Sequence, residues 1–195
     1  MFSRLRKLPL LVPAVRAVLV LSGCGDSHTR VTTGTYAGEA GKAAPYLNVG
    51  PLLYQVQISR QLNPANPEDA AYLQGLSATE RAIEPDQEWF AVFMQVYNTT
   101  NEAHPDSSDY TITDTQNNVY TPLPLSEENL YAYRPGTVPA NNQIPAAGTV
   151  ADNSGPQGAL LLFKIQIASL DNRPFELKIT NPENPAESAS VTLDV

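Results

Sequence analysis

The feature that most constrains the fold of this chain is a period-two alternation of apolar residues that begins near Tyr46. Alternation of this kind predicts β-strands with one buried face, and no long segment shows the period of a helix. The alternating sets are Leu52, Tyr54, Val56 and Ile58; Phe90, Val92, Met94 and Val96; Ala159, Leu161, Phe163, Ile165 and Ile167; Phe175, Leu177 and Ile179; and Val191, Leu193 and Val195.

Two features of this pattern indicate how the strands are arranged. Between Trp89 and Tyr97 both alternating sets are largely apolar, which is typical of a central strand covered on both faces. Asn117-Asn118 separates two short β-prone runs and tolerates the positive φ of a tight hairpin turn. We therefore predict an all-β fold for residues 46–195, an antiparallel two-sheet immunoglobulin-like sandwich of seven or eight strands.

The long first loop of this domain carries signals for one or two short helical turns. Asn66 is a suitable N-cap before Pro67, and Gly75 is a suitable stop. Ser77 and Glu80 have the spacing of a capping box. For the core, we predict that four residues from the apolar strand faces are buried, namely Val56, Val92, Phe163 and Leu177.

The N-terminal segment has the parts of an exported lipoprotein. Residues 1–23 combine a basic start with an apolar run, which predicts a signal peptide, and the run is too short and interrupted to span a membrane. Leu21-Ser22-Gly23-Cys24 resembles the lipobox of bacterial lipoproteins, so we expect a lipid on Cys24. Residues 24–45 are small and polar and predict a flexible tether. The expected location is the outer face of the bacterial cell membrane or the cell envelope.

The charge and the cysteine count exclude several classes of partner. After residues 1–24 are removed, 20 acidic residues remain against 8 Lys and Arg, a formal charge of −12. Such an acidic chain is repelled by phosphates, so we expect no nucleic acid partner. Because Cys24 is the only cysteine, the folded domain has no disulfide and no cysteine-based metal site. We expect no cofactor.

The order of the predicted strands is similar to that of a known group of proteins. The chain has a central "WFAVFMQVYNTTNEAH" strand, a "YTITDTQNNVYTPL" hairpin, and late "GALLLFKIQI" and "RPFELKIT" strands. Over residues 46–182 this resembles the bacterial secreted and lipoprotein domains of unknown function that have a telokin-like, immunoglobulin-type β-sandwich. That group carries no catalytic motif to transfer, and its first loop is usually shorter than residues 60–88.

The candidates for catalysis and metal binding are few. His104 has Ser107 and Ser108 near it in sequence, but a short loop is poorly suited to hold a catalytic triad. Loop 102–109 is the densest group of metal-ligand types, yet it lacks the spacing of a calcium loop. The two lysines of the domain, Lys164 and Lys178, are predicted to face solvent. We therefore predict no catalytic residue and no metal site, and we expect that the chain is not an enzyme.

The remaining function is recognition. Tyr131, Tyr133 and Arg134 form the best candidate for an aromatic recognition patch, although packing at the sandwich edge is favoured for these rings. We expect a lipid-anchored, non-catalytic interaction module of the cell envelope. It contacts the membrane through Cys24 and binds an envelope protein, a peptide or a glycan. The alternative is an envelope protein that binds a small molecule or a metal through loop 102–109.

Overall fold

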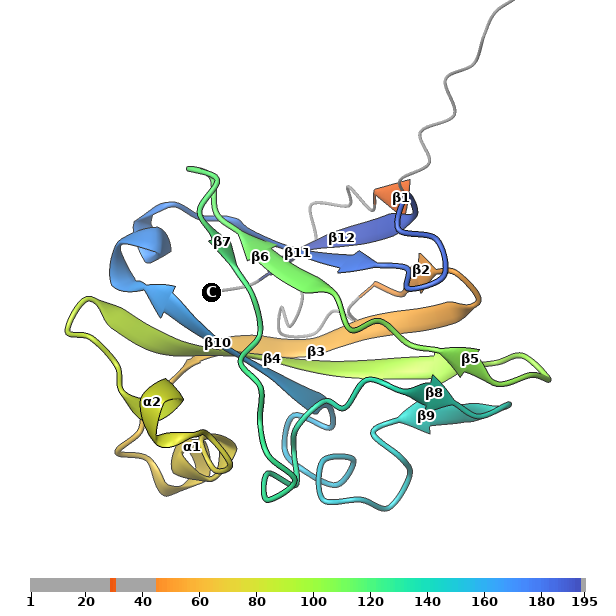
Figure 1. Cartoon of the computed structure of the whole chain (residues 1–195), viewed down its shortest axis with the longest axis horizontal. Helices are drawn as coiled ribbons and strands as arrows, with labels where there is room; N and C mark the ends of the chain where they lie inside the picture. Colours follow the sequence, from red (N-terminus) through yellow and green to blue (C-terminus); the bar gives the residue numbers. More distant parts are fainter. Residues whose placement is uncertain (1–28, 31–44, 194–195) are drawn as a thin grey trace, which may run out of the picture.

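The strands form two facing sheets, as the computed structural model shows for the residues that it describes, 29–30 and 45–193 (Figure 1). Sheet A runs in the order β1 (Thr29–Arg30), β12 (Ser188–Leu193), β11 (Phe175–Thr180), β6 (Tyr110–Thr113) and β7 (Val119–Tyr120). Sheet B runs in the order β10 (Ala159–Gln166), β4 (Gln87–Asn98), β3 (Leu52–Leu62) and β2 (Leu47–Val49), and β9 (Asn142–Ile144) also pairs with β4. A separate pair joins β5 (His104–Pro105) to β8 (Thr137–Val138).

The predicted antiparallel sandwich is confirmed at the level of its two sheets and its core. Apart from the parallel pairing of β1 with β12, the strand ladders are antiparallel. The inner faces of the two sheets enclose a main core that includes the four residues predicted to be buried, Val56, Val92, Phe163 and Leu177. The strand between Trp89 and Tyr97 is central, because β4 lies between β3 and β10. The predicted sets did not include the short strands β1, β2, β5, β8 and β9.

The predicted hairpin at Asn117-Asn118 is also confirmed. Asn117 has φ 65° and connects β6 to β7. Asp114 organises this turn, because its carboxylate accepts hydrogen bonds from the backbone N–H groups of Gln116 and Asn118, each at 2.9 Å. Burial raises the pKa of Asp114, but the hydrogen bonds from Asn118, Ser169 and backbone N–H groups outweigh this effect, so the pKa is lowered to about 2.

Two residues of the alternating sets do not lie where the pattern predicts. A β-bulge between Val56 and Ile58 inserts one extra residue, Gln57, so Ile58 changes face and packs outside the main core. Strand β10 ends at Gln166, and the next residues form a 3₁₀ helix, η1 (Ile167–Asp171), in which Ile167 is exposed. The apolar pattern thus continues across a bulge within β3 and past the end of β10, and Val195 of the last set lies outside the described residues.

The long first loop forms two short helices, α1 (Pro67–Tyr72) and α2 (Ala78–Arg81). Their predicted starts are confirmed, because the Asn66 side chain accepts a hydrogen bond from the N–H of Glu68 at 2.9 Å, and Ser77 and Glu80 form a reciprocal capping box. Arg60 on β3 forms an ion pair with the buried carboxylate of Asp69 on α1. This contact fixes α1 against sheet B.

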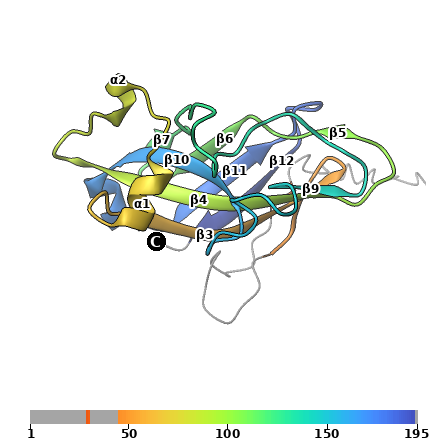
Figure 2. The same ribbon diagram turned by 90° about the horizontal axis from the view of Figure 1, so that it is seen from below.

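Among residues 45–193, an apolar cover packs on the outer face of sheet B at one end. There α1 and its connecting segments pack on the strands, as Figure 2 shows from below. This second core unites eight buried residues: Leu62, Tyr72, Leu76, Trp89, Ala91, Phe93, Leu160 and Leu162. The apolar outer set of β4 is therefore explained by a cover that the first loop supplies.

The predicted signal peptide, residues 1–23, and the predicted lipid attachment at Cys24 lie outside the described residues. Within the predicted tether, residues 24–45, the described strand β1 pairs in parallel with β12, so that Thr29 is opposite Ala189. None of the described helices is both long and apolar enough to cross a membrane.

Candidate functional site

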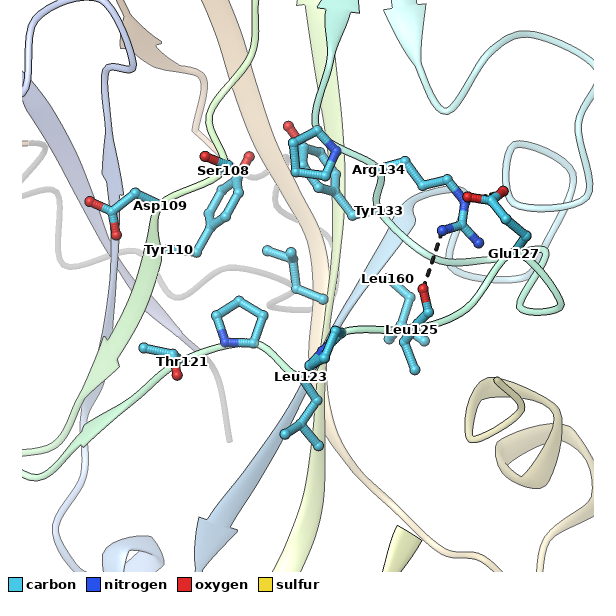
Figure 3. Close-up of a pocket in the computed structure, with 14 residues that line it drawn as sticks. Ser108, Asp109, Tyr110, Thr121, Leu123, Leu125, Glu127, Tyr133, Arg134 and Leu160 are labelled. Carbon is cyan, nitrogen blue, oxygen red and sulfur yellow. Dashed lines mark hydrogen bonds and ion pairs between the residues drawn. The ribbon is translucent and has the colours of Figure 1, made fainter. Parts of the chain in front are cut away.

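A cavity of about 560 Å³ opens at the side of the sandwich, where the edge of β10 faces the β6 side of sheet A (Figure 3). The volume falls within the ~300–1,000 Å³ range of ligand-binding pockets. The lining combines apolar, prolyl and a few polar side chains, which are Ser108, Asp109, Tyr110, Thr121, Pro122, Leu123, Pro124, Leu125, Glu127, Tyr133, Arg134, Pro135, Leu160 and Leu161. We take this cavity as the candidate binding site.

The segment 121–135 creates the cavity because it follows the edge of β10 only in part. Leu123 donates its backbone N–H to the carbonyl of Leu162 at 2.7 Å, but Pro122 and Pro124, on either side of Leu123, have no N–H to donate. The segment then leaves the strand and returns where Tyr133 donates its N–H to the carbonyl of Leu160 at 2.8 Å. The intervening residues 124–130 make no backbone hydrogen bond to β10, and Pro124, Leu125 and Glu127 among them line the cavity.

The floor of the cavity is held by a buried network of tyrosines. The Tyr110 and Tyr133 rings meet edge to face with their centroids 5.2 Å apart. The Tyr133 hydroxyl donates to the Asp106 carboxylate at 2.6 Å, and the Tyr54 hydroxyl accepts the N–H of Ser107 at 2.8 Å. Burial raises the pKa of all three tyrosines, so their hydroxyls stay protonated at neutral pH. They can shape a site, but they do not serve as bases.

The rim of the cavity carries charge on two opposite sides. Figure 3 places Asp109 on one side and Glu127 with Arg134 on the other. The Arg134 guanidinium donates to three backbone carbonyls, including that of Ser126 at 2.7 Å, and lies 3.4 Å from the exposed Glu127 carboxylate. The hydrogen bonds of Arg134 thus stabilise the loop at residues 125–129, whereas the side chains of Asp109 and Glu127 are exposed. With two carboxylates and one guanidinium, the rim has a formal charge of −1 around an apolar floor.

The ligand types of loop 102–109 do not converge. His104 Nε2 lies 2.9 Å from the Thr100 hydroxyl, whereas the buried Asp106 carboxylate turns inward to Tyr133 and the backbone of Gly136. Asp109 belongs to the cavity rim instead. Among the described residues, no three His, Cys, Asp or Glu side chains are grouped as a metal site would require. The structure therefore does not bring the metal-ligand types of this loop together, although Ser108 and Asp109 of the loop line the side cavity.

The predicted aromatic patch is split between two places. Tyr133 is buried as part of the cavity floor, and Tyr131 packs edge to face on Tyr72 with a centroid distance of 4.8 Å. Edge packing thus accounts for both rings. The sequence did not identify Tyr110, Leu123 or Leu160 as site residues. The run of prolines alternating with leucines at 122–125 was the one signal that this segment is an irregular edge.

The lysines of the domain differ in their surroundings. Lys178 is exposed, as predicted. Lys164 is partly covered, because its Nζ donates to the Ala82 carbonyl at 2.6 Å and lies 5.4 Å from the centroid of the Trp89 ring. Neither lysine lies in the cavity.

Comparison of the sequence with protein-family models gives no match, and neither does comparison with curated proteins. The fold resembles a candidate lipoprotein, ycdA, from Bacillus subtilis, with a TM-score of 0.50 and 13% identity over 78% of this chain and 39% of that chain. It also aligns with the yjhA protein of Bacillus subtilis, with a TM-score of 0.49 and 14% identity over 78% of this chain and 99% of that one. A further alignment is with an uncharacterised β-sandwich protein from Clostridium difficile, with a TM-score of 0.42 and 8% identity over 78% and 92% of the two chains. The likeness to ycdA shows a shared fold, and the chain spans less than half of that protein's length.

Proposed function

We propose that this chain is a lipid-anchored, non-catalytic binding module of the bacterial cell envelope. The observation that carries the proposal is the side cavity, which joins an apolar floor of leucines and protonated tyrosines to an acidic rim. Such a lining suits recognition, because the apolar floor favours an apolar group and the rim favours positive charge. The lining contains no histidine and no cysteine, the residue types that most often act in acid–base and nucleophilic catalysis.

The order of the strands supports an immunoglobulin-like assignment for the module. Strands β3, β4 and β10 follow one another in sheet B, as strands A, B and E do in an immunoglobulin sandwich. Strands β12, β11, β6 and β7 follow one another in sheet A, as strands G, F, C and C′ do. In this assignment the cavity lies between the C side of one sheet and strand E of the other.

The anchor rests on Leu21-Ser22-Gly23-Cys24 and its position after an apolar run. The protein ycdA, whose fold this chain resembles, is itself described as a candidate lipoprotein. Two or more acyl chains, at about 0.8 kcal/mol for each buried CH₂, hold a protein firmly on a membrane. Replacing Cys24 with Ala should move the protein from the detergent phase to the aqueous phase in a phase-separation assay. A Cys24→Ala variant that stays in the detergent phase contradicts the anchor.

The occupant we propose for the cavity is an extended segment of another envelope protein, with apolar side chains flanked by lysine or arginine. The argument is charge complementarity, since residues 45–193 hold 17 Asp and Glu against 6 Lys and Arg. Two of these acids and one of these arginines lie at the rim, and Asp109 is the acid that Arg134 does not pair with. The apolar side chain would lie against Leu160 and Tyr110, and the basic residue would meet Asp109 or Glu127.

A matched pair of peptides tests this occupant. The sequences are acetyl-Lys-Leu-Pro-Leu-Lys-amide and the same peptide with glutamate in place of lysine. Titration of the purified full-length chain should show binding of the lysine peptide only, weakened by Asp109→Asn with Glu127→Gln and by added salt. Asp171→Asn with Glu183→Gln, at acids outside the cavity, is the control and should leave binding unchanged. Equal binding of both peptides, or binding of neither, contradicts this occupant.

A further inference from the structure

A second region of the surface has a different chemistry, at the end of sheet B that α1 leaves uncovered. The outer face there carries carboxamides and a tyrosine in place of the apolar residues of the second core. Gln57 Nε2 donates to the side-chain oxygens of Gln55 and Gln95, each at 2.8 Å, and the Tyr97 hydroxyl donates to Gln95. Tyr46 packs edge to face on Tyr97 with a centroid distance of 5.9 Å, and its side chain is 55% exposed.

This amide face ends in a cavity of about 360 Å³ beside β9, at the opposite end of the sheet from α1 (Figure 1). Strand pairing builds it, because Tyr97 on β4 lies directly opposite Gln143 on β9 and directly opposed side chains share a face. Every residue of the lining is uncharged: Tyr97, Asn98, Thr99, Asn141, Asn142, Gln143 and Ala147.

The polar groups of this cavity divide into structural ones and available ones. The buried Asn98 amide donates to three backbone carbonyls, and Gln143 Nε2 donates to Asp152 at 3.1 Å, so both are fixed by the fold. Thr99 and Asn141 are exposed, and their side chains make no hydrogen bond to the rest of residues 45–193. The site thus combines preset amides with others that still have donors and acceptors to offer.

The absence of charge in this lining contrasts with the acidity of the domain. The carboxylate that touches the lining, Asp152, is held by Gln143 and by the backbone N–H of Gly148 at 2.8 Å. A site for a cationic ligand would expose carboxylates, as the rim of the side cavity does. A neutral lining of amides, a hydroxyl and tyrosine rings instead matches a ligand that is uncharged and rich in hydroxyl or acetamido groups.

We propose that the amide cavity binds a short stretch of an uncharged saccharide chain. The Tyr97 and Tyr46 rings offer apolar surfaces for the C–H faces of pyranose rings, and each carboxamide offers a donor and an acceptor to neighbouring hydroxyls. Tyr97 lines the cavity and Tyr46 packs on the Tyr97 ring, so one sugar chain can meet both rings and the amides of the lining. This inference goes beyond the proposed function, since it uses another site and another class of ligand.

The test is a calorimetric titration of the purified full-length chain with cellotriose, tri-N-acetylchitotriose and trigalacturonate. We expect one or both uncharged trisaccharides to bind, and the anionic trigalacturonate to bind at least about tenfold more weakly. Asn141 has φ 52°, so glycine removes its amide without straining the backbone. Asn141→Gly should weaken saccharide binding by about tenfold, as expected when one or two hydrogen bonds are lost.

Asn117→Gly is the matched control, because Asn117 also has positive φ and lies in the β6–β7 turn, outside the cavity. It should bind saccharide as the parent chain does. Tyr46→Ala, at an exposed ring, should weaken binding without loss of the fold. The proposal is overturned if neither uncharged trisaccharide binds at about 10 mM, which is weaker than a useful site. It is also overturned if trigalacturonate binds equally well, or if Asn141→Gly and Asn117→Gly have the same effect.

Discussion

The outer face of sheet B has two ends that differ in side-chain chemistry and in what covers them. At the α1 end, Trp89, Ala91 and Phe93 are apolar and lie under a second core. Further along the same strand, Gln95 and Tyr97 occupy equivalent positions and stay partly exposed. One strand therefore changes from a packing surface to a polar surface within its own length. The covered end stabilises the domain, and the other end carries the amides to which we propose that a saccharide binds.

The bulge in β3 lies at the boundary between the two ends. Before it, Tyr54 and Val56 point into the main core. After it, Ile58 and Leu62 belong to the outer face, where α1 covers them. A single inserted residue thus transfers the apolar positions of a strand to the face on which the first loop folds back. The bulge therefore determines which end of the outer face is apolar, and the first loop covers that end.

The largest effect is expected in the main core, on which both ends of the sheet depend. Phe163 is fully buried between the sheets. Phe163→Ala should lower the free energy of unfolding by about 3–5 kcal/mol, through lost burial and the cavity left behind. Denaturant unfolding measures this value. Leu130→Ala, at a side chain that is 64% exposed, is the control and should change stability little. A near-neutral Phe163→Ala would mean that the core is not where the alternation and the fold both place it.

The second core should be weaker and more local. Leu76 lies between α1 and α2 and is buried in that cluster. Leu76→Ala should cost about 2–3 kcal/mol, at the lower end for a buried leucine, because a short loop can relax around the gap. Hydrogen exchange should rise in residues 60–82 and remain unchanged in β11 and β12. Uniform loss of protection across both sheets would show that the cover and the sandwich unfold as one unit.

The sequence predicts the inner faces of the sheets better than it predicts the outer face of sheet B. Alternation predicts the inner faces well, because burial against a second sheet selects every other residue, as at Val92 and Leu177. Caps such as Ser77 predict helix starts for a similarly local reason. The bulge at Gln57 is invisible to this approach, because one extra residue leaves an apparently regular pattern in the sequence while it reverses the face.

The candidate sites are harder to predict than the strands. The side cavity depends on where residues 121–135 leave the edge of β10, which is a contact between segments distant in the chain. The amide cavity depends on the pairing of Tyr97 with Gln143, which are separated by an irregular stretch. Neither pairing has a local signal. Prolines at 122 and 124 indicate an interrupted edge, but they do not indicate what lies opposite it.

Acid should loosen the covered end before the main core. Asp69 is buried on α1. Burial raises the pKa of its carboxyl, but the hydrogen bonds from Arg60 and from the N–H of Asn63 outweigh this effect, so the pKa is lowered below its usual value. A carboxyl whose pKa is lower in the folded state than in the unfolded state stabilises the fold at pH values above its unfolded pKa. This contribution is lost as the pH falls through the folded-state pKa.

Asp69→Asn should cost about 1–2 kcal/mol at neutral pH, since it removes a charge-assisted hydrogen bond to Arg60. The hydrogen-exchange protection factors of residues 60–72, which are corrected for the intrinsic pH dependence of exchange, should fall between pH 5 and pH 3 in the parent chain. They should depend less on pH in the variant. Glu68→Gln, at the exposed neighbour of Asp69, is the matched control. The same pH response in parent and variant would show that Asp69 does not govern the attachment of α1.

The smallest effect concerns the one acidic residue of β4, Glu88, which lies at the end of the inner face opposite Ile165. Its Oε1 is buried without a hydrogen-bond partner among the described residues, and burial raises the pKa of its carboxyl above 4.5. Because the folded state disfavours the charged form, Glu88 destabilises the fold as the pH rises through 4.5. Glu88→Gln should therefore raise the free energy of unfolding at neutral pH by a few tenths of a kcal/mol, and the gain should vanish near pH 3. Urea unfolding of both chains at the two pH values measures this difference, with the exposed Glu84→Gln as control. A loss of stability at neutral pH would show that the Glu88 carboxylate has a favourable partner on the inner face.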